Sequence, residues 1–357
     1  MRWWRPALPP APIPYTLLAD RHILLLPKAA MSMRAVIYTG AGGTEVIQIG
    51  EVPKPEVRPE HIRVRVRAAG LNRADLIQRR GQYAAPAGWP ADIPGLEYAG
   101  EVEAVRGASK WKVGDRVMGL VGGGAMAELL TVHQDEALAI PAGLTDAEAA
   151  AIPEVFLTAF DALVTRGRLA AGERVLIHAV GSGVGTAAAQ IARHLGATVL
   201  GTSRNADKLA RATVYGLDVG IDTSRHGFRD AVGEPVHVVL DVLGGPAFAD
   251  NLHVLAPRGR LVLLGLLAGG RTTADLSAIL HKRLEVIGTV MRIRGGEERV
   301  PLVRAFAERL LPLFDQRIEH AAPLRPVLER TYPMAELAEA HRVLEANETV
   351  GKVVVTW

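Results

Sequence analysis

A glycine-rich segment separates a short apolar run from a helical pattern, and its residues are Gly181, Ser182, Gly183, Val184 and Gly185. The apolar run at 175–179 has the length and composition of a buried strand. After the glycines, alanine, isoleucine and leucine recur at helical spacing until Gly196 ends the pattern. A strand, a glycine turn and a helix in this order begin a dinucleotide-binding βαβ unit, in which the backbone approaches a pyrophosphate at the helix N-terminus. Such glycine patterns also occur in loops without a ligand, so the following sequence has to decide.

The next predicted strand, 198–202, ends about 20 residues past the glycine turn, where this unit carries the side chain that reads the ribose. NAD-binding proteins usually have Asp or Glu there. This chain has Ser203 and Arg204 instead, and Lys208 follows one helical turn later. A hydroxyl and two cations suit a 2′-phosphate and include no carboxylate that would repel it. The segment therefore predicts NADP(H) as the cofactor, with an ordinary solvated helix start as the alternative for the two cations.

The composition describes a globular protein and excludes several classes of function. A chain of 357 residues suggests two domains, and 49% hydrophobic with 22% charged residues provides a substantial core. The net charge of +3 is spread along the chain, so we expect no nucleic-acid partner. Since no apolar stretch reaches about 18 residues, we expect no membrane span. Cysteine is absent, which excludes disulfides, thiolate nucleophiles and Cys-ligated metals and is compatible with the cytoplasm, where we expect the protein.

The pattern of predicted elements changes along the chain. Residues 1–33 are rich in proline and form an N-terminal extension, poorly ordered or loosely packed, with a targeting arm as the alternative. Short strands and glycine turns at 34–156 are typical of an antiparallel β-barrel. Alternating strands and helices at 157–291 predict a doubly wound parallel sheet of the Rossmann type. Residues 292–357 contain two helical patterns and a last strand, 352–356, that returns to the first domain.

The sequence also predicts the bounds of the later strands and of the last helices. The later strands of the parallel sheet are predicted at 236–240, 261–265 and 285–289. The two helical patterns that follow are predicted at 300–313 and 334–344.

Seven stretches spread over both domains carry a resemblance to a known family. They are GLNRADLIQRRGQY from Gly70, PGLEYAGEV from Pro94, KVGDRVMGL from Lys112, LTAFDAL from Leu157, HAVGSGVGTAAAQIA from His178, LDVLGG from Leu240 and AHRVLEANETVGKVVV from Ala340. In these stretches the chain after residue 33 resembles the zinc-free quinone oxidoreductases of the medium-chain dehydrogenase/reductase superfamily, closest to the p53-inducible branch. The resemblance implies a GroES-like catalytic barrel beside the Rossmann domain.

The resemblance also bears on metals. Relatives with zinc have a metal ligand at three positions, which hold Asn72, Leu96 and Glu154 here. A leucine cannot bind a metal, and an amide is a poor zinc ligand compared with thiolate or imidazole. The cysteine-rich loop of a second, structural zinc is missing as well. We therefore expect no metal and no zinc alcohol dehydrogenase chemistry.

Roles near the reacting atoms follow from the same resemblance. It implies that Asn72 lies beside the nicotinamide and Tyr83 near the substrate mouth, where hydrogen-bond donors would stabilise the developing oxyanion. The alternatives are a turn cap after Gly70 for Asn72 and a tyrosine that only covers the cleft for Tyr83. Thr158 is expected to open a helix and to contact the nicotinamide end, or to be a plain helix N-cap. Glu97 and Asp75 are expected to support the fold rather than to act as a base.

Further cofactor contacts are implied at the ends of the later strands and in the last strand, namely Leu243, Gly265, Leu266 and Lys352. A solvated lysine on an edge strand is the alternative for Lys352. One residue argues against NADP(H): several relatives carry a tyrosine beside the 2′-phosphate where this chain has Asp222, whose carboxylate would weaken binding of the phosphate.

Three functions are compatible with these observations. The first is an NADPH-dependent quinone reductase that works without zinc, and the second is an NADPH-dependent reductase of enones or 2-alkenals. The third, of another class, is an NADPH-binding structural protein or redox sensor, because a fold alone does not fix a function. The family also implies a homodimer joined along the strand at 285–289.

Overall fold

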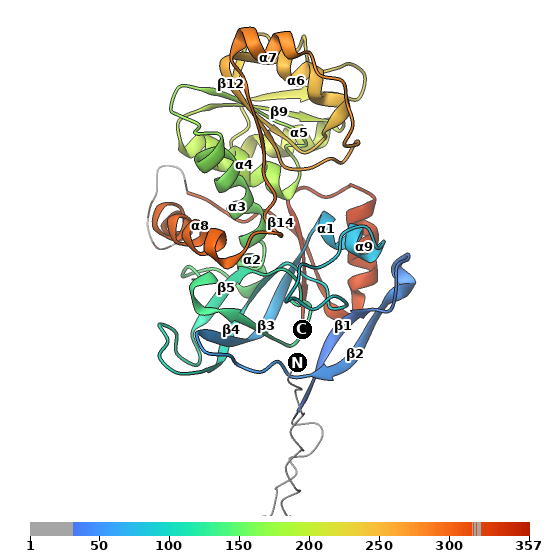
Figure 1. Ribbon diagram of the computed structural model, residues 1–357, viewed down its shortest axis with the longest axis vertical. Coiled ribbons are helices and arrows are strands. Elements are labelled where there is room, and N and C mark those ends of the chain that lie inside the picture. Colours follow the sequence, from blue (N-terminus) through green and yellow to red (C-terminus); the bar gives the residue numbers. More distant parts are fainter. Residues whose placement is uncertain (1–30, 316, 318, 320–322) are drawn as a thin grey trace, which may run out of the picture.

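The computed structural model describes residues 31–315, 317, 319 and 323–357, which form two lobes stacked end to end (Figure 1). Most of the extension predicted at 1–33 lies outside the described residues. Strand β1, Ser32–Tyr38, already begins at Ser32, so the boundary predicted at 33 is slightly late. None of the described helices combines the length and the apolar character that a membrane span requires.

The lower lobe contains a seven-stranded sheet in the order β14-β15-β3-β4-β5-β7, with β6 also paired to β3. Its strands are β3 (His61–Leu71), β4 (Glu97–Val105), β5 (Arg116–Leu120), β6 (Leu129–His133), β7 (Ala137–Ala139), β14 (Leu328–Pro333) and β15 (Lys352–Thr356). All pairs are antiparallel except β14 with β15. Strands β1 and β2 (Ile47–Pro53) form a separate antiparallel hairpin. The predicted antiparallel, GroES-like domain is confirmed, as is the return of the last strand to it.

The upper lobe is a six-stranded parallel sheet in the order β10-β9-β8-β11-β12-β13. Its strands are β8 (Arg174–Ile177), β9 (Thr198–Ser203), β10 (Val219–Asp222), β11 (Val236–Asp241), β12 (Leu255–Leu263) and β13 (Glu285–Gly288). The first strand in sequence, β8, lies between β9 and β11, so the chain reverses its direction of winding there. Ligands of such sheets bind at this switch point, beyond the carboxyl ends of the strands. The predicted doubly wound sheet is thus confirmed.

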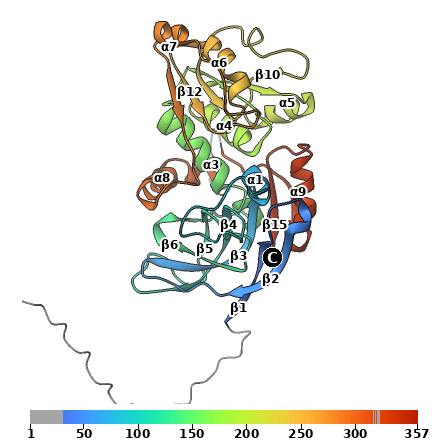
Figure 2. The ribbon, with the colours of Figure 1, turned by 45° about the vertical axis from the view of Figure 1, so that its right-hand side comes forward.

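Helices surround both sheets. In the upper lobe they are α4 (Gly183–His194), α5 (Ala206–Ala212), α6 (Phe248–Val254) and α7 (Leu276–Lys282), and in the lower lobe α1 (Arg73–Arg79), α2 (Asp146–Ala149), α8 (Gly296–Arg309) and α9 (Leu337–Glu345). Short 3-10 turns lie at Thr44–Val46, Gln134–Glu136, Thr213–Tyr215, Gly245–Ala247, Leu311–Phe314 and Met334–Glu336. Helices α1 and α9 contact each other on the side of the lower lobe that faces the upper lobe (Figure 2).

Several boundaries differ from the predicted ones, among them the ends of α8 and β12. Helix α8 ends at Arg309 rather than at 313, because Pro312 has no N–H to continue the helix and the chain tightens into a 3-10 turn. Strand β12 ends at Leu263 rather than at 265, although the N–H of Leu264 still donates to the carbonyl of Asp241 at the end of β11. Gly265 and Leu266 therefore lie in the loop after the strand.

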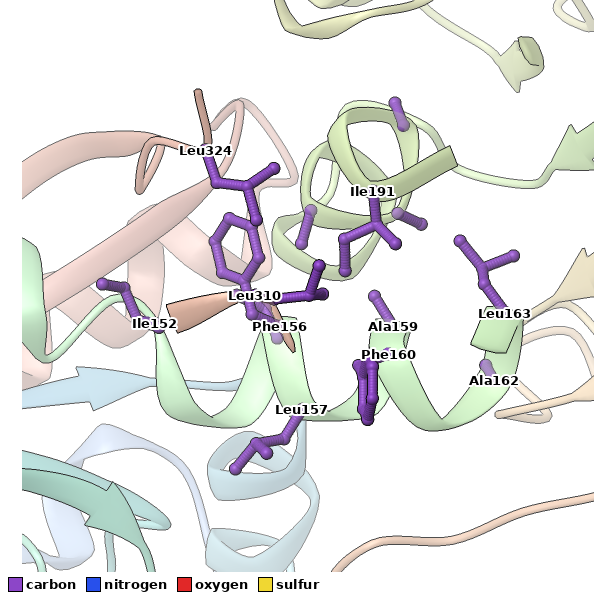
Figure 3. Close-up of a cluster of buried hydrophobic side chains, with 14 of the residues drawn as sticks. Ile152, Phe156, Leu157, Ala159, Phe160, Ala162, Leu163, Ile191, Leu310 and Leu324 are labelled. Carbon is purple, nitrogen blue, oxygen red and sulfur yellow. The ribbon is translucent and has the colours of Figure 1, made fainter. Parts of the chain in front are cut away.

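Helix α3, Pro153–Phe160, lies between the lobes and continues as a π-helix, Asp161–Arg166. It begins with a proline, whose fixed φ suits the first helical position. Thr158 is therefore in the interior of the helix, and the prediction that it opens the helix is wrong. The buried face of α3 packs on α4 and on the C-terminal segment through Ile152, Phe156, Leu157, Phe160, Leu163, Ile191, Leu310 and Leu324 (Figure 3). Each such large side chain contributes roughly 1.5–3 kcal/mol when fully buried.

The chain passes between the lobes twice, and a buried carboxylate joins the two passages. Asp161 follows α3 on the first passage, while Thr289 and Arg294 belong to the second, between β13 and α8. The Oδ2 atom of Asp161 accepts hydrogen bonds from Thr289 Oγ1 at 2.7 Å and from Arg294 Nη2 at 2.6 Å.

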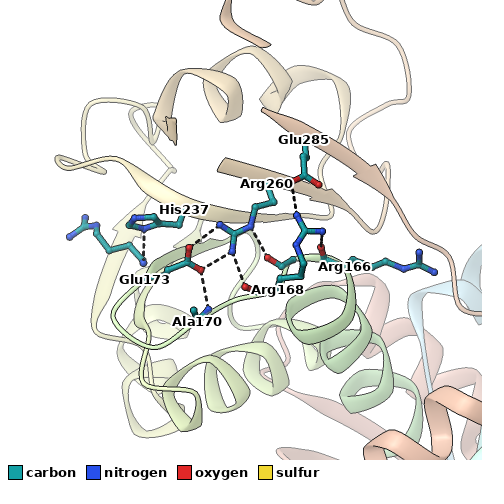
Figure 4. A network of polar contacts seen from close by, with 9 residues as sticks. Arg166, Arg168, Ala170, Glu173, His237, Arg260 and Glu285 are labelled. Carbon is teal, nitrogen blue, oxygen red and sulfur yellow. Dashed lines mark hydrogen bonds and ion pairs between the residues drawn. The ribbon is translucent and has the colours of Figure 1, made fainter. Parts of the chain in front are cut away.

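A second network fixes the segment that leads from the π-helix into the parallel sheet. Arg260 on β12 donates to the carbonyl oxygens of Gly167 and Arg168, and it pairs with both oxygens of Glu173 at 2.9 and 2.7 Å (Figure 4). Because the pair is bidentate and mostly shielded, it holds the start of β8 against β12.

Candidate functional site

The glycine turn between β8 and α4 forms a cradle at the switch point of the sheet. Ser182 is the N-cap of α4, and its Oγ accepts a hydrogen bond from the Gly185 N–H at 3.1 Å. A methyl group added at Gly185 would lie 2.5 Å from the carbonyl oxygen of Ala179, so the close packing of helix and strand requires glycine there. The first N–H groups of the helix are left for a ligand, as in the phosphate sites of such turns. The predicted strand, turn and helix are confirmed.

The same turn touches the first turn of α3 and the last strand. A methyl group at Gly183 would lie 2.9 Å from Val155 and 2.8 Å from Lys352. A dinucleotide whose pyrophosphate lies on the turn would therefore have its next part beside the N-terminus of α3, in the seam between the lobes.

The end of β9 carries the predicted ribose-reading side chains. Lys208 is only 7% exposed, and its aliphatic stem lies against Gly181, so the alternative of an ordinary solvated lysine is wrong for it. Burial lowers the pKa of its ammonium, and the nearby charge of Arg73 lowers it further. Arg73, from α1 of the lower lobe, was missed because only the tertiary structure brings it near. Arg204 is exposed, as a solvated side chain would be, and Ser203 Oγ accepts from the Asn205 N–H at 3.1 Å.

Asp222 lies opposite Ser203 in the pairing of β10 with β9. Its carboxylate accepts a hydrogen bond from the Ser224 N–H at 2.8 Å, and this bond lowers the pKa of Asp222. A negative charge therefore stands next to the cations at this end of the sheet, as the sequence indicated.

On the lower lobe, Asn72 is held by a buried network. Its Nδ2 donates to Glu97 Oε1 at 2.9 Å and to the carbonyl of Gly70 at 3.3 Å, and its Oδ1 accepts from Lys352 Nζ at 2.6 Å. Asn72 is also the N-cap of α1, and its N–H donates to Asp75 Oδ2 at 2.8 Å. Both amide hydrogens are used within the protein, so the side chain is placed firmly but has only a lone pair of Oδ1 left for a ligand.

Lys352 is only 3% exposed. Its ammonium donates to three acceptors, which are the Leu71 carbonyl, Asn72 Oδ1 and, at 2.7 Å, Glu97 Oε1. The alternative of a solvated edge lysine is wrong, because β15 lies between β14 and β3. Its methylene groups, rather than its charge, face the glycine turn at Gly183.

Two polar groups on one face of α3 have no partner in the part of the chain that the structure describes. They are Glu154 Oε2 and Thr158 Oγ1, which are shielded from solvent and stand one helical turn apart. Burial and then the neighbouring carboxylate of Glu97 raise the pKa of Glu154 to about 8. Sequence reasoning considered Glu154 only as a possible metal ligand and so missed this group.

Tyr83 is half-buried, and Arg292 holds both its backbone carbonyl and its ring. The Arg292 guanidinium donates to the carbonyls of Tyr83 and Gly122 and to Gln78 Oε1, the last at 2.6 Å. Burial raises the pKa of Tyr83, although the charge of Arg292 opposes this. Arg292 was not singled out from the sequence. It could have been noticed because two arginines, Arg292 and Arg294, stand in the loop after the last parallel strand.

The loops after β11 and β12 complete this side of the seam. Asp241 Oδ1 accepts the N–H groups of Leu243 and Gly244, and Leu266 lies against Gly244. Leu243 is half-buried and Leu266 is largely exposed. The predicted residues at the two strand ends thus lie together, next to the glycine turn.

The three positions that bind zinc in other proteins do not supply a coordination sphere here. Leu96 offers no donor atom, and Asn72 is engaged by Lys352 and Glu97. Among the residues that the structure describes, no group of three His, Asp or Glu side chains is arranged to hold a metal ion. This donor set does not fit zinc, whose protein sites use three or four nitrogen, sulfur or carboxylate ligands.

Comparisons with known proteins agree with this architecture. Residues 58–142 match the model of the alcohol dehydrogenase GroES-like domain, and residues 183–308 match that of the zinc-binding dehydrogenase. A quinone oxidoreductase of Pseudomonas aeruginosa is 32% identical over 329 residues, which cover 90% of this chain and 99% of that protein. The synaptic vesicle membrane protein VAT-1 homolog of Rattus norvegicus is 32% identical over 350 residues, 91% of this chain and 84% of that one. A mycobacterial protein solved with NADPH has a TM-score of 0.77 at 30% identity, covering 91% of this chain and 100% of its own.

Proposed function

Because the chain belongs to the medium-chain dehydrogenase/reductase superfamily, as the quinone oxidoreductases that it resembles do, we propose that this oxidoreductase is an NADPH-dependent quinone reductase that works without zinc. The observation that carries the proposal is the contact of Gly183 with Val155 and Lys352. This contact supports a path for the cofactor from the glycine turn to the first turn of α3 and to Lys352, whose ammonium holds Asn72.

The choice of NADPH over NADH is supported by Lys208. Lys208 is largely buried and, among the described residues, the charge of Glu329 acts on its ammonium without a close ion pair, so a 2′-phosphate would add an anionic partner. Arg204 adds a second cation, and the NADPH complex of a similar mycobacterial protein agrees with this choice. The carboxylate of Asp222 opposes binding of the 2′-phosphate and so limits the preference for NADPH over NADH.

The bound nicotinamide supplies the hydride, while the residues of the chain orient the reactants and exclude water from them. Thr158 offers a shielded hydroxyl to the nicotinamide end, while Asn72 forms a fixed wall. Tyr83, held by Arg292, covers the acceptor and limits the access of water. A quinone needs little further help, because its oxyanion is delocalised and positioning supplies most of the acceleration.

A panel of quinones, enones and 2-alkenals with NADPH tests the proposal. We expect the fastest NADPH oxidation with quinones, and treatment with a chelator should leave the rate unchanged. Turnover confined to enones would support the second candidate function. Tight binding of NADPH without oxidation by any acceptor would indicate a structural or sensor protein.

We also propose a homodimer joined along β13. This strand is the edge of the parallel sheet, and apolar side chains near it are exposed, namely Leu276, Leu280, Val286, Val290 and Ile293. An edge strand with an apolar surface is suited to pairing with a second copy. Sedimentation should give a dimer at micromolar concentration, and V286K should shift the protein to the monomer.

A further inference from the structure

Three carboxyl groups and two cations meet at the floor of the seam, and Asp75 and Glu97 are fully buried while Glu154 is partly buried with a shielded Oε2 atom. The carboxyls are Asp75, Glu97 and Glu154, and the cations are Lys352, which pairs with Glu97, and Arg292, whose charge acts on Asp75 and Glu154. With all three carboxyls ionised, the cluster would hold one uncompensated negative charge. An unpaired charge is costly away from water, and the cost is avoided when one carboxyl keeps its proton.

Hydrogen bonds identify the carboxyl that keeps the proton. Glu97 accepts from Asn72 Nδ2, from Lys352 Nζ and, at 2.7 Å, from the N–H of Glu154. Asp75 accepts from the N–H groups of Asn72 and Gly95 at 2.8 and 3.2 Å, and these bonds oppose the burial that raises the pKa of Asp75 to about 6. Such donors stabilise the charged form of a carboxyl.

Glu154 has no such support. Its Oε2 atom is buried and has no hydrogen-bond partner among the described residues. Among the described residues, the charges that act on it are Asp75 on α1, Glu97 on β4, Lys352 on β15 and Arg292 after β13. The neutral acid is therefore at Glu154, and its raised pKa, about 8, agrees with the count of charges.

The position of this acid suits a role in the reaction. Glu154 is next in sequence to Val155, which touches the glycine turn, and it stands one turn before Thr158 on the same face of α3. It is also close enough to Tyr83 at the mouth for its charge to act on the phenol. An unpartnered O–H group thus lies where the nicotinamide and the acceptor would meet.

We propose that Glu154 is a catalytic residue that gives the acceptor oxygen its proton. This inference rests on the proposed function. The quinone accepts a hydride with both electrons from the reduced nicotinamide and becomes the hydroquinone monoanion. The O–H bond of Glu154 breaks, its proton bonds to the anionic oxygen, and hydroquinone forms. The carboxylate of Glu154 then takes a proton from solvent, which restores the starting state.

The variant E154Q tests the proposal, because glutamine keeps the shape but cannot give up a proton. We expect kcat with a quinone to fall about 100-fold, within the range of general acid catalysis, while the Kd for NADPH stays within about twofold. The wild-type kcat should decrease as pH rises through about 8, and E154Q should lack this decrease. E308Q, at an exposed glutamate of α8, is the matched control and should behave as the wild type. E154D, which keeps an acid, should recover part of kcat and serves if E154Q folds poorly.

E154Q with the kcat and the pH profile of the wild type would overturn the assignment. A wild type that binds NADPH but reduces no quinone would overturn the proposed function instead. The proton itself can then be observed directly by infrared difference spectroscopy of wild type against E154Q at pH 7. A carboxylic acid band that disappears in the variant supports the neutral Glu154, and its absence from the wild type contradicts it.

Discussion

The guanidinium carbon of Arg292 lies 4.7 Å from the centre of the Tyr83 ring, while one guanidinium nitrogen donates to the carbonyl of the same tyrosine. Arg292 thus holds both the side chain and the backbone of Tyr83 from a segment far away in the sequence. The mouth of the seam is therefore ordered by a residue of the second passage between the lobes.

R292K should loosen the mouth, because an ammonium cannot donate to three acceptors in one plane and also stack on a ring. We expect kcat/KM for a quinone to fall about tenfold and the free energy of unfolding to fall by about 1–3 kcal/mol. The Kd for NADPH should not change. Steady-state kinetics and denaturant unfolding measure these effects, with R304K at an exposed position of α8 as the control. Unchanged kinetics would mean that the Tyr83 loop needs no such support.

The cations at the end of β9 should set the choice of cofactor. In R204Q and K208Q we expect the Kd for NADPH to rise about tenfold each and the Kd for NADH to stay nearly constant, since only NADPH carries the 2′-phosphate. R229Q, at an exposed arginine of the same lobe, is the control. Fluorescence titration of both cofactors makes the comparison, and an equal loss for NADH would contradict a phosphate-reading role.

Removing the opposing charge should act in the other direction. D222N should tighten NADPH binding several-fold at low salt, and the effect should shrink as salt screens the exposed carboxylate. The same titration at two salt concentrations measures it. No change at low salt would place Asp222 too far from the phosphate to matter.

Alanine should destabilise the protein at Gly185 in the glycine turn but not at an open glycine elsewhere. G185A would press a methyl group against two backbone carbonyls, and we expect it to lower the free energy of unfolding by roughly 1–3 kcal/mol. G227A is the matched control, because no atom lies within 4 Å of a methyl group there. Thermal unfolding of both variants checks the difference, and equal melting temperatures would show that α4 can move away from β8.

The raised pKa of Glu154 also predicts how stability depends on pH. The folded protein binds this proton more tightly than the unfolded chain, whose glutamate titrates near 4.5, so the contribution is complete below pH 4.5. It is lost as pH rises through about 8. Relative to E154Q, the wild type should therefore lose stability on the order of 3 kcal/mol between pH 5 and pH 9. Urea unfolding of the two proteins at several pH values measures this difference, and parallel curves would contradict a buried neutral acid.

Features that depend on local sequence could be predicted. The glycine turn, β9 and β11 follow from apolar runs and turn residues that are adjacent in the chain. Leu243 and Gly265 were correctly placed at one edge of the sheet, because parallel strands end together, although both lie in the loops just after the strands and not at the strand ends.

Features that depend on distant partners could not be predicted in this way. The alternative of a solvated edge lysine arose for Lys352 because its neighbour β14 was not recognised, and β14 buries the strand. The raised pKa of Glu154 arises from burial and from the carboxylates of Glu97 and Asp75, which belong to two other elements and act against the opposing charges of Lys352 and Arg292. Thr158 was misplaced for a local reason, since Pro153 was not recognised as the start of the helix.

The carboxylate of Asp161 is a fixed point between the two lobes. It fastens the outward and the returning passage of the chain to each other at one buried point, through Thr289 and Arg294. A motion that preserves these bonds keeps the two passages joined at this point, and a motion that separates them must break two buried hydrogen bonds.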